Sequence, residues 1–399
     1  MNFINKYSYI CNRCNSRYSS KEIEDNLLYL CPKCGKAEKQ SPLEGVLLIE
    51  YDYDNFKNNI KRDDFLKFEP GKPWLYPQLW PIDFQKIEIQ LLDHLVLPAD
   101  NLFSYKINSR DILVFDETRN PTLSYKDRAS SLVVLKAIEL GISEISAAST
   151  GNAGSSLAGI CARLGLQSHI FVPKNIPEAK RIQIVAYGAD LVVVDGDYDL
   201  AFDTCLEVSL ENNWYNRNTA YNPLTIEGKK SAAFDIFLQM NGNIPNIIII
   251  PMGDGVIISG IYKGFTELLK LGWINKLPQL IGVQSKNSDA IVKFLDEGKF
   301  EYKPANTIAD SISAGAPRNL YMAAEAITQS NGRGISISDE NILLAQKEFI
   351  RATGIFCEPS SAATLAAFKK LKDDKMVRNK SVLLLITGNG LKDINALKY

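Results

Sequence analysis

From about residue 110 to the C-terminus, the chain alternates short apolar runs with longer amphipathic segments. The runs Glu144–Ala148, Ser168–Val172 and Asp190–Val194 are bounded by turn residues, a pattern typical of buried strands. The intervening segments Ala153–Leu164 and Pro177–Tyr187 carry apolar residues at helical spacing. This alternation predicts parallel βαβ units whose sheets are covered by helices on both faces.

The alternation occurs in two series and therefore predicts two α/β lobes. The first series opens with a strand at Ile112–Phe115 and a helix at Arg128–Leu140. The second series contains these predicted elements: Thr225–Gln239, Asn246–Pro251, Ile257–Leu271, Gln279–Val283, Asp339–Thr353, Ser361–Leu371 and Ser381–Thr387. We assign residues 46–125 and 241–399 to a large lobe and residues 126–240 to a small lobe. A ligand cleft is expected at the carboxyl ends of the strands.

The first part of the chain has a different character. Residues 1–45 are polar and contain two CxxC pairs, Cys11-Asn-Arg-Cys14 and Cys31-Pro-Lys-Cys34. Two such pairs at this spacing supply four thiolates for a tetrahedral, structural zinc site, whereas the alternatives are four free cysteines or a redox pair. The paired arrangement favours a zinc ribbon. Residues 46–105 are rich in aromatic residues and proline, which predicts irregular wrapping structure with a strand at Val46–Tyr51.

Composition narrows the possible functions. Among 399 residues, 45 Lys and Arg balance 46 Asp and Glu, so bulk charge favours neither nucleic acid nor an acidic membrane as a partner. Met1–Ile10 lacks the apolar stretch of a signal peptide, and no apolar run is long enough to span a bilayer. We therefore expect a cytoplasmic protein. Only two histidines, His94 and His169, are present, which leaves little material for a Ser-His-Asp triad or a multi-histidine metal site.

A lysine offers chemistry that does not depend on histidine. Lys126, within Asn120-Pro-Thr-Leu-Ser-Tyr-Lys-Asp-Arg128, immediately precedes a predicted helix. The positive end of a helix dipole disfavours the ammonium form and promotes the neutral amine that a Schiff base requires. The alternative is a solvated lysine in a first helical turn, and the position alone leaves both interpretations open.

Three further turns follow predicted strands. Ser149-Thr-Gly-Asn-Ala-Gly154 offers small residues and free amides that suit a carboxylate, and Asn152 is suited to bind a phenolate oxygen. Pro251-Met-Gly-Asp-Gly-Val256 is a candidate phosphate cradle. Thr387 ends the last predicted strand, where its hydroxyl can point into the cleft.

Together these motifs resemble the fold-type-II family of pyridoxal-phosphate (PLP) enzymes, with the tryptophan synthase β-like fold, and within it the threonine synthases. The family's lysine motif, close to NPTGSFKDR, stands here as NPTLSYKDR. Its STGN motif stands at Ser149–Asn152, its TGxGLKD motif at Thr387–Asp393 and its EPxSAA segment at Glu358–Ala363. Many threonine synthases also carry an N-terminal zinc ribbon. The resemblance covers nearly the whole chain.

The resemblance implies a role for each matching residue. Lys126 would form the Schiff base with PLP, held by the large lobe, and would move protons. The implied cofactor-binding residues are Lys126, Asn152 at O3′, Gly253, Asp254, Gly255 and Val256 at the phosphate, and Thr387 at the pyridine nitrogen. The implied substrate-binding residues are Ser149, Thr150 and Gly151 at the carboxylate, and Asn218 and Thr219 at a phosphate; the metal ligands are Cys11, Cys14, Cys31 and Cys34. A homodimer acting on a small amino acid, with no nucleic-acid or membrane partner, is expected.

Several positions depart from the family pattern. The glycine after NPT is Leu123 here, and the phenylalanine is Tyr125. In Asn218-Thr-Ala-Tyr-Asn-Pro-Leu-Thr-Ile-Glu-Gly228, which resembles the family's NSxNPYRIEG, Thr225 stands where an arginine grips the substrate phosphate. A phosphate dianion needs cationic help. Three nearby residues are candidates to supply it: Arg217, Lys229 and Lys230.

Three functional hypotheses follow. The first is threonine synthase, which converts O-phospho-L-homoserine and water to L-threonine and phosphate. The second is a β-replacement or elimination enzyme, cysteate synthase-like or a threonine/serine dehydratase, which would explain Thr225. The third is a non-enzymatic docking module built on a zinc ribbon. The near-neutral charge and the presence of Lys126, Asn152 and Thr387 argue against the third.

Overall fold

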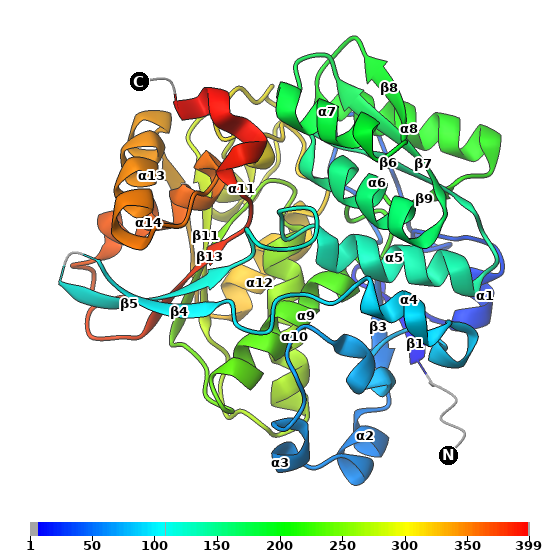
Figure 1. Ribbon diagram of the computed structural model, residues 1–399, viewed down its shortest axis with the longest axis horizontal. Helices are drawn as coiled ribbons and strands as arrows, with labels where there is room; N and C mark the ends of the chain where they lie inside the picture. The colour runs from blue at the N-terminus through cyan, green and yellow to red at the C-terminus, as the bar shows by residue number, and fades with distance from the viewer. Residues whose placement is uncertain (1–6, 108, 398–399) are drawn as a thin grey trace.

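The computed structural model describes residues 7–107 and 109–397 (Figure 1). In this part of the chain the strands form a three-stranded, a six-stranded and a four-stranded sheet. The two larger sheets are the α/β lobes that the alternating pattern predicts, and the smallest lies at the N-terminus.

The six-stranded sheet has the order β12-β11-β10-β13-β5-β4. Its strands are β4 (Leu102–Ile107), β5 (Arg110–Asp116), β10 (Ile247–Pro251), β11 (Gln279–Ser285), β12 (Arg333–Ile337) and β13 (Val382–Ile386). All neighbours are parallel except β4, which pairs antiparallel with β5. Ile248 and Ile250 of β10 belong to one hydrophobic core and Ile247 and Ile249 to another, so the sheet is buried on both faces.

The four-stranded sheet is wholly parallel, with the order β8-β7-β6-β9. Its strands are β6 (Glu144–Ala148), β7 (Gln167–Pro173), β8 (Asp190–Val194) and β9 (Tyr215–Asn216). The helices of this region are α5 (Asp127–Glu139), α6 (Asn152–Leu164), α7 (Glu178–Ala186) and α8 (Tyr198–Asn212). The predicted strands and helices agree with these bounds to within two residues, but α8 and β9 were not predicted.

The remaining long helices are α9 (Leu224–Gln239), α10 (Val256–Lys270), α11 (Ala290–Glu297), α12 (Leu320–Gln329), α13 (Asp339–Thr353) and α14 (Pro359–Leu371). Helix α9 is buried along almost its whole length and packs against both α5 and α10. It thereby joins the two lobes. The domain boundaries stay a prediction.

At the N-terminus, β1 (Tyr7–Cys11) pairs antiparallel with β2 (Arg17–Ser19) and β3 (Leu47–Tyr51), and α1 (Ser20–Glu24) follows β2. The segment that follows contains only short helices: α2 (Tyr53–Asn59), α3 (Arg62–Phe65), α4 (Ile89–Asp93) and three 3-10 turns (Pro73–Leu75, Pro77–Leu79, Phe84–Lys86). Phe65, Tyr76 and Trp80 from this segment are buried against Phe234 of α9, as expected for wrapping structure. Among the helices of the described residues, none has the length and apolar character needed to cross a membrane.

Candidate functional site

The loop between β5 and α5 is fixed by a buried charge network. The Arg128 guanidinium pairs with Glu117 at 2.7 Å and with Asp235 at 2.6 Å, and all three side chains are buried. Asn120 donates its Nδ2 to Glu117 at 2.7 Å. Because each buried charge has an opposite charge beside it, the network holds the loop in one conformation rather than leaving a desolvated ion.

The same loop lies against the end of β13. Tyr125 N–H donates to the Thr387 carbonyl at 2.9 Å, and Asn389 N–H donates to the Leu123 carbonyl at 3.1 Å. Leu123 has φ of +68°, a left-handed conformation that suits the glycine of the family motif. The Tyr125 hydroxyl donates to the Lys229 carbonyl at 2.8 Å. These bonds place Lys126 and Thr387 at the same edge of the sheet.

Lys126 occupies the N-cap position of α5 and is partly buried. Its Nζ makes no hydrogen bond or ion pair with any group in residues 7–107 and 109–397. Burial lowers the pKa of its ammonium to about 8, against the opposing pull of Glu358, and the positive charges of Arg217 and Lys180 lower it further. At pH 7 about one molecule in ten then carries the neutral amine, compared with fewer than about one in a thousand at an ordinary lysine pKa. The residue is poised to act as a nucleophile or base.

The Ser149–Asn152 turn follows β6 and opens α6. Gly151 has φ of +130°, and a Cβ there would lie 2.2 Å from Lys180 Cδ, so this turn needs glycine. Asn152 Nδ2 donates to Glu358 Oε2 and to Ser311 Oγ, both at 2.8 Å. Its Oδ1 is buried and accepts no hydrogen bond from a described residue, which leaves one acceptor free at this point.

An ion pair that the sequence did not reveal supports this turn. The buried Lys180 Nζ lies 2.8 Å from Asp310 and 3.0 Å from Glu358. The sequence marks Glu358 only as part of a family segment. Lys180 carries no local signal, since it lies on the amphipathic helix α7 far from every motif. The Glu358 N–H also donates to the Gly388 carbonyl at 2.9 Å, which ties this cluster to the end of β13.

The Gly253–Val256 turn joins β10 to α10. Gly255 has φ of +88°, and a Cβ there would lie 2.5 Å from Ala323 Cβ, so only glycine fits. The Asp254 carboxylate accepts from the Tyr198 hydroxyl at 2.8 Å and from Arg318 N–H at 3.0 Å. No described group accepts a hydrogen bond from the amides of Gly253, Asp254 or Gly255. Free amides at the N-terminus of a helix form an anion site.

One cavity is lined by most of the residues predicted to bind cofactor or substrate. Its lining comes from the β5–α5 loop, the glycine turn, the end of β13, the start of α9 and the turn η4 (Asp310–Ile312). The residues that line it are Lys126, Thr219, Lys229, Pro251, Gly253, Asp254, Gly255, Val256, Ile257, Ser311, Ile312 and Thr387. Thr150 instead lines a neighbouring hollow with Asp197, Asp199 and Asp310.

Lys229 lines this cavity, and Arg217 acts electrostatically on both Lys229 and Lys126; neither cation has a carboxylate partner among the described residues. Arg217 follows β9, and both of its terminal guanidinium nitrogens are buried without a hydrogen-bond partner among the described residues. Within residues 7–107 and 109–397, Lys229 Nζ donates to Thr219 Oγ1 alone, at 3.2 Å. Burial lowers the pKa of Arg217 to about 10 and that of Lys229 well below its usual range, and Arg217 lowers the latter further. Two desolvated cations are unfavourable unless an anion binds between them.

Asn218, a predicted substrate contact, and Thr225, which stands at the family's arginine position, both bond to the backbone. Thr225 is fully buried; its hydroxyl donates to the Asn222 carbonyl at 2.8 Å and accepts from Ala220 N–H at 3.1 Å. Asn218 Oδ1 accepts from Ala148 N–H at 2.6 Å, which anchors it to the end of β6. Both side chains therefore shape the turn, and Thr219 is the member of this segment that lines the cavity.

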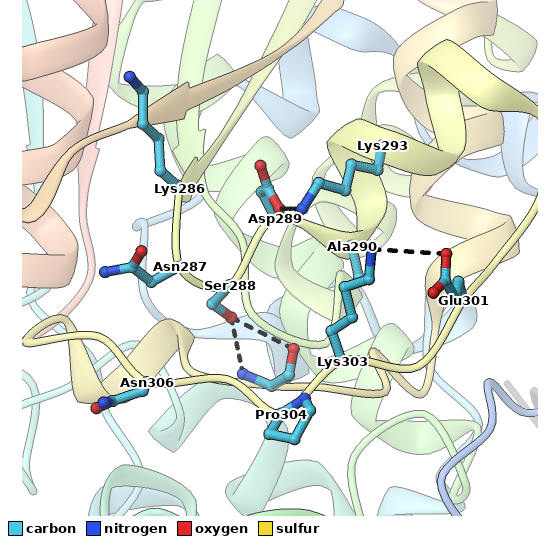
Figure 2. A pocket seen from close by; sticks show the side chains of 11 residues that line it. Lys286, Asn287, Ser288, Asp289, Ala290, Lys293, Glu301, Lys303, Pro304 and Asn306 are labelled. Carbon is cyan, nitrogen blue, oxygen red and sulfur yellow. Dashed lines mark hydrogen bonds and ion pairs between the residues drawn. The ribbon is translucent and has the colours of Figure 1, made fainter.

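A separate hollow lies at the carboxyl end of β11 (Figure 2). It is lined by residues 286–290, Lys293, Glu301, Lys303, Pro304, Asn306 and Ala314. Lys293 pairs with Asp289 at 2.7 Å and Lys303 with Glu301 at 3.5 Å, as the dashed lines in Figure 2 show. Their charges are compensated, and Lys126 and the glycine turn contribute nothing to this hollow.

The four N-terminal cysteines converge as the CxxC spacing predicts. Their Sγ atoms all lie within 4.8 Å of one another, with Cys11 and Cys34 at 3.4 Å and Cys14 and Cys31 at 3.7 Å. Four sulfur donors at this separation fit one thiophilic metal ion and leave no position open for substrate. The arrangement is that of a structural site.

The residues present fit PLP. That cofactor needs a primary amine, an anion cradle for its phosphate and polar partners for its ring. The cavity offers the unpartnered amine of Lys126, the free amides of the Gly253–Val256 turn, and the hydroxyl of Thr387 with the buried amide of Asn152 beside it.

Comparison with known proteins agrees with this geometry. A sequence profile described as pyridoxal-phosphate dependent enzyme matches residues 96–388. The chain belongs to the pyridoxal-phosphate-dependent enzyme family. The threonine synthase of Methanocaldococcus jannaschii is 35% identical over 97% of this chain and 93% of its own length, and that of Methanosarcina acetivorans is 34% identical over 97% and 92%. The protein is thus a threonine synthase-like PLP enzyme.

The fold of the family is also seen in solved structures. The diaminopropionate ammonia lyase from Escherichia coli superimposes with a TM-score of 0.66 at 17% identity, over 79% of this chain and 91% of that one. This similarity confirms the fold-type-II architecture predicted from the motifs.

Proposed function

We propose that the protein is a threonine synthase, which converts O-phospho-L-homoserine and water to L-threonine and phosphate. The observation that carries this proposal is the pair of unpartnered buried cations, Arg217 and Lys229, beside Lys126. A substrate with a dianionic phosphate ester compensates both charges. A substrate without a phosphate, such as threonine or serine, would leave them buried and unpaired. The relatives over nearly the full length support the same substrate.

In this proposal Lys126 is the catalytic residue. When bound, PLP supplies the electron withdrawal that makes the substrate α-proton acidic. The lowered pKa of Lys126 lets its neutral amine take that proton near neutral pH and return it later. Its position in the β5–α5 loop, locked by Arg128 and Glu117, keeps Nζ in one place.

The surrounding residues bind and orient the ligands. The Ser149–Gly151 turn faces the substrate carboxylate at the start of α6. Ser149 N–H donates to the Phe171 carbonyl and Gly151 N–H to Ser149 Oγ, both at 2.9 Å, so the Thr150 amide is the one in this turn with no acceptor among the described residues. The Gly253–Val256 turn binds the cofactor phosphate, Asn152 its O3′ and Thr387 its ring nitrogen. Thr219 lines the cavity beside Lys229 and donates a hydroxyl to the substrate phosphate, while Asn218 fixes the turn that presents it.

The function is tested by mixing the pure protein, loaded with PLP, with O-phosphohomoserine and measuring phosphate and threonine. We expect both products in equal amounts. Parallel reactions contain threonine alone, serine alone, or O-phosphoserine with sulfite. Turnover of any of these without turnover of O-phosphohomoserine would contradict the proposal and favour the elimination or β-replacement enzyme that Thr225 suggests.

The acidity of Lys126 gives a pH prediction. Only the neutral amine attacks the PLP aldehyde, and the folded-state pKa is about 8. Uptake of PLP by cofactor-free protein is therefore expected to accelerate about tenfold for each pH unit up to about 8 and to level off above it. Stopped-flow absorbance, with borohydride trapping and peptide mapping of Lys126, measures this rate. A rate still rising steeply at pH 9.5 would show that burial does not lower this pKa.

We also propose that Cys11, Cys14, Cys31 and Cys34 hold one Zn²⁺ per chain. Because the Sγ atoms are already gathered, a tetrahedral ion fits without rearrangement. Replacing Cys34 by serine is expected to release the ion and to lower the melting temperature, since the ribbon has little core of its own. Elemental analysis and calorimetry measure both, with Cys161→Ser as the matched control. Zinc retained at one equivalent by the Cys34 variant would exclude the four-thiolate site.

The homodimer and the cytoplasmic location stay predictions.

A further inference from the structure

Arg318, in the loop before α12, is a fully buried residue that contacts three parts of the fold. Its NH1 donates to the carbonyls of Glu38 at 3.3 Å and Ser41 at 3.1 Å, in the loop that follows the second CxxC pair. Its NH2 lies 3.1 Å from the Asp203 carboxylate of α8. One guanidinium therefore joins the ribbon to the small lobe.

Two further contacts hold Arg318 between the ribbon loop and α8. Leu43 N–H donates to the Arg318 carbonyl at 3.0 Å, so the ribbon loop both accepts from and donates to the same residue. The guanidinium carbon lies 4.3 Å from the centroid of the Phe202 ring on α8. A guanidinium is the cation suited to several planar acceptors at once.

The backbone of the same residue holds the glycine turn. Arg318 N–H donates to Asp254 Oδ1 at 3.0 Å, and Asn319 N–H donates to the Asp254 carbonyl, also at 3.0 Å. The other Asp254 oxygen accepts from Tyr198 on α8 at 2.8 Å. The turn that presents the free amides is thus held through Asp254 by elements that Arg318 itself ties to the ribbon.

We propose that Arg318 is a positioning residue through which the four-cysteine ribbon holds the Gly253–Val256 turn in the shape that binds the cofactor phosphate. The inference rests on the proposed assignment of that turn to the phosphate. It gives the ribbon a function beyond its own stability, because amides bind an anion well only when they converge on it. Loss of the side chain leaves the Arg318 N–H in place but frees its loop from the ribbon and from α8.

The test compares two ligands that differ by the phosphate alone. Arg318→Lys and Arg318→Met are titrated with PLP and with pyridoxal, and binding is measured from the absorbance of the bond to Lys126. We expect the Kd for PLP to rise about tenfold, the order seen when a group that orients a binding group is lost, and the Kd for pyridoxal to stay unchanged. Equal weakening of both ligands, or no change for PLP, would overturn the proposal.

A matched control removes a contact between the same elements. Lys39, in the ribbon loop, pairs with Glu207 of α8 at 2.8 Å on the surface and reaches neither Arg318 nor Asp254. Lys39→Ala is expected to leave both Kd values unchanged. If Arg318→Met does not fold, Arg318→Lys keeps a positive charge but has one nitrogen where Arg318 uses two, NH1 for the ribbon carbonyls and NH2 for Asp203. It cannot keep both sets of contacts, so its Kd values still test the proposal.

A second measurement tests whether the ribbon acts through Arg318. Cys34→Ser is expected to weaken PLP binding by a similar factor in the parent protein but to add nothing in the Arg318→Lys background. Effects that multiply would overturn this coupling. If the serine variant does not fold, Gly45→Ala replaces it. Gly45 has φ of +64°, and a Cβ there would lie 2.9 Å from the Gly35 backbone and 3.1 Å from Cys31 Cβ, which distorts the ribbon while all four thiols are retained. None of these outcomes depends on which amino acid the enzyme converts.

Discussion

Replacing Lys126 by alanine is expected to reduce turnover of O-phosphohomoserine by about 10⁴-fold or more while raising the stability of the cofactor-free protein. The loss of activity follows from the role of this amine as the proposed proton carrier and site of PLP attachment. The gain in stability follows from burial, which lowers the Lys126 pKa from 10.5 to about 8. Below pH 8 the folded protein therefore holds a disfavoured ammonium, at a cost of up to about 3 kcal/mol.

The sign of the pH dependence follows from the same shift. A depressed lysine pKa means that the unfolded chain binds the proton more tightly, so the penalty is present below pH 8 and disappears as the pH rises above 10.5. Chemical denaturation of the parent protein and of Lys126→Ala, both without cofactor, should differ most at neutral pH and converge at high pH. A variant less stable than the parent at pH 7 would contradict this account.

Another buried lysine on the same helix supplies the control. Lys136 pairs with Glu139 at 2.8 Å and with Glu24 at 3.3 Å. Lys136→Ala is expected to destabilise the protein by about 3 kcal/mol, since two carboxylates lose their partner, and to leave turnover unchanged. The two substitutions remove the same chemical group from α5 and should change stability in opposite directions.

Much of the fold could be predicted because buried parallel strands appear in the sequence as continuous apolar runs. β10 is IIIIP and fully buried, and β13 is equally apolar. Within the six-stranded sheet, the unpredicted strands are β4 and β12, which lie at its two edges, where polar residues alternate with apolar ones. Helix α8 has apolar residues on several sides and little periodicity, so its sequence carries no clear helical face.

The residues of the candidate site also differ in how far their positions could be predicted from the sequence. Lys126, Asn152 and Thr387 follow strands or open helices, so the sequence around each predicts its position at one edge of a sheet. Lys180 and Glu358 meet across 178 positions, and Arg318 meets Ser41 across 277, with no local pattern that links either pair. Such contacts depend on how the lobes and the ribbon pack, which periodicity does not encode.

The second large effect is expected on the KM, when a residue proposed to bind the substrate phosphate is replaced. Arg217→Met is expected to raise the KM for O-phosphohomoserine about 100-fold, because a charge-assisted hydrogen bond contributes about 1.5–3 kcal/mol and the guanidinium offers two. The phosphate is present in ground state and transition state alike, so kcat should change less than KM. Inorganic phosphate should inhibit the parent enzyme and lose most of its inhibition in the variant.

The matched control stands at the position where the family has its arginine. Thr225→Val removes a hydroxyl whose partners among the described residues are two backbone groups of its own turn, so we expect a loss of about 1 kcal/mol in stability and an unchanged KM. Lys229→Met should raise the KM as Arg217→Met does, and because both cations face one anion, the two effects should not add independently. A raised KM in Thr225→Val with a normal KM in Arg217→Met would show that the phosphate binds where the family's motif places it. The opposite result would mean that the cation has moved from position 225 to positions 217 and 229, so that the charge is retained although the motif is not.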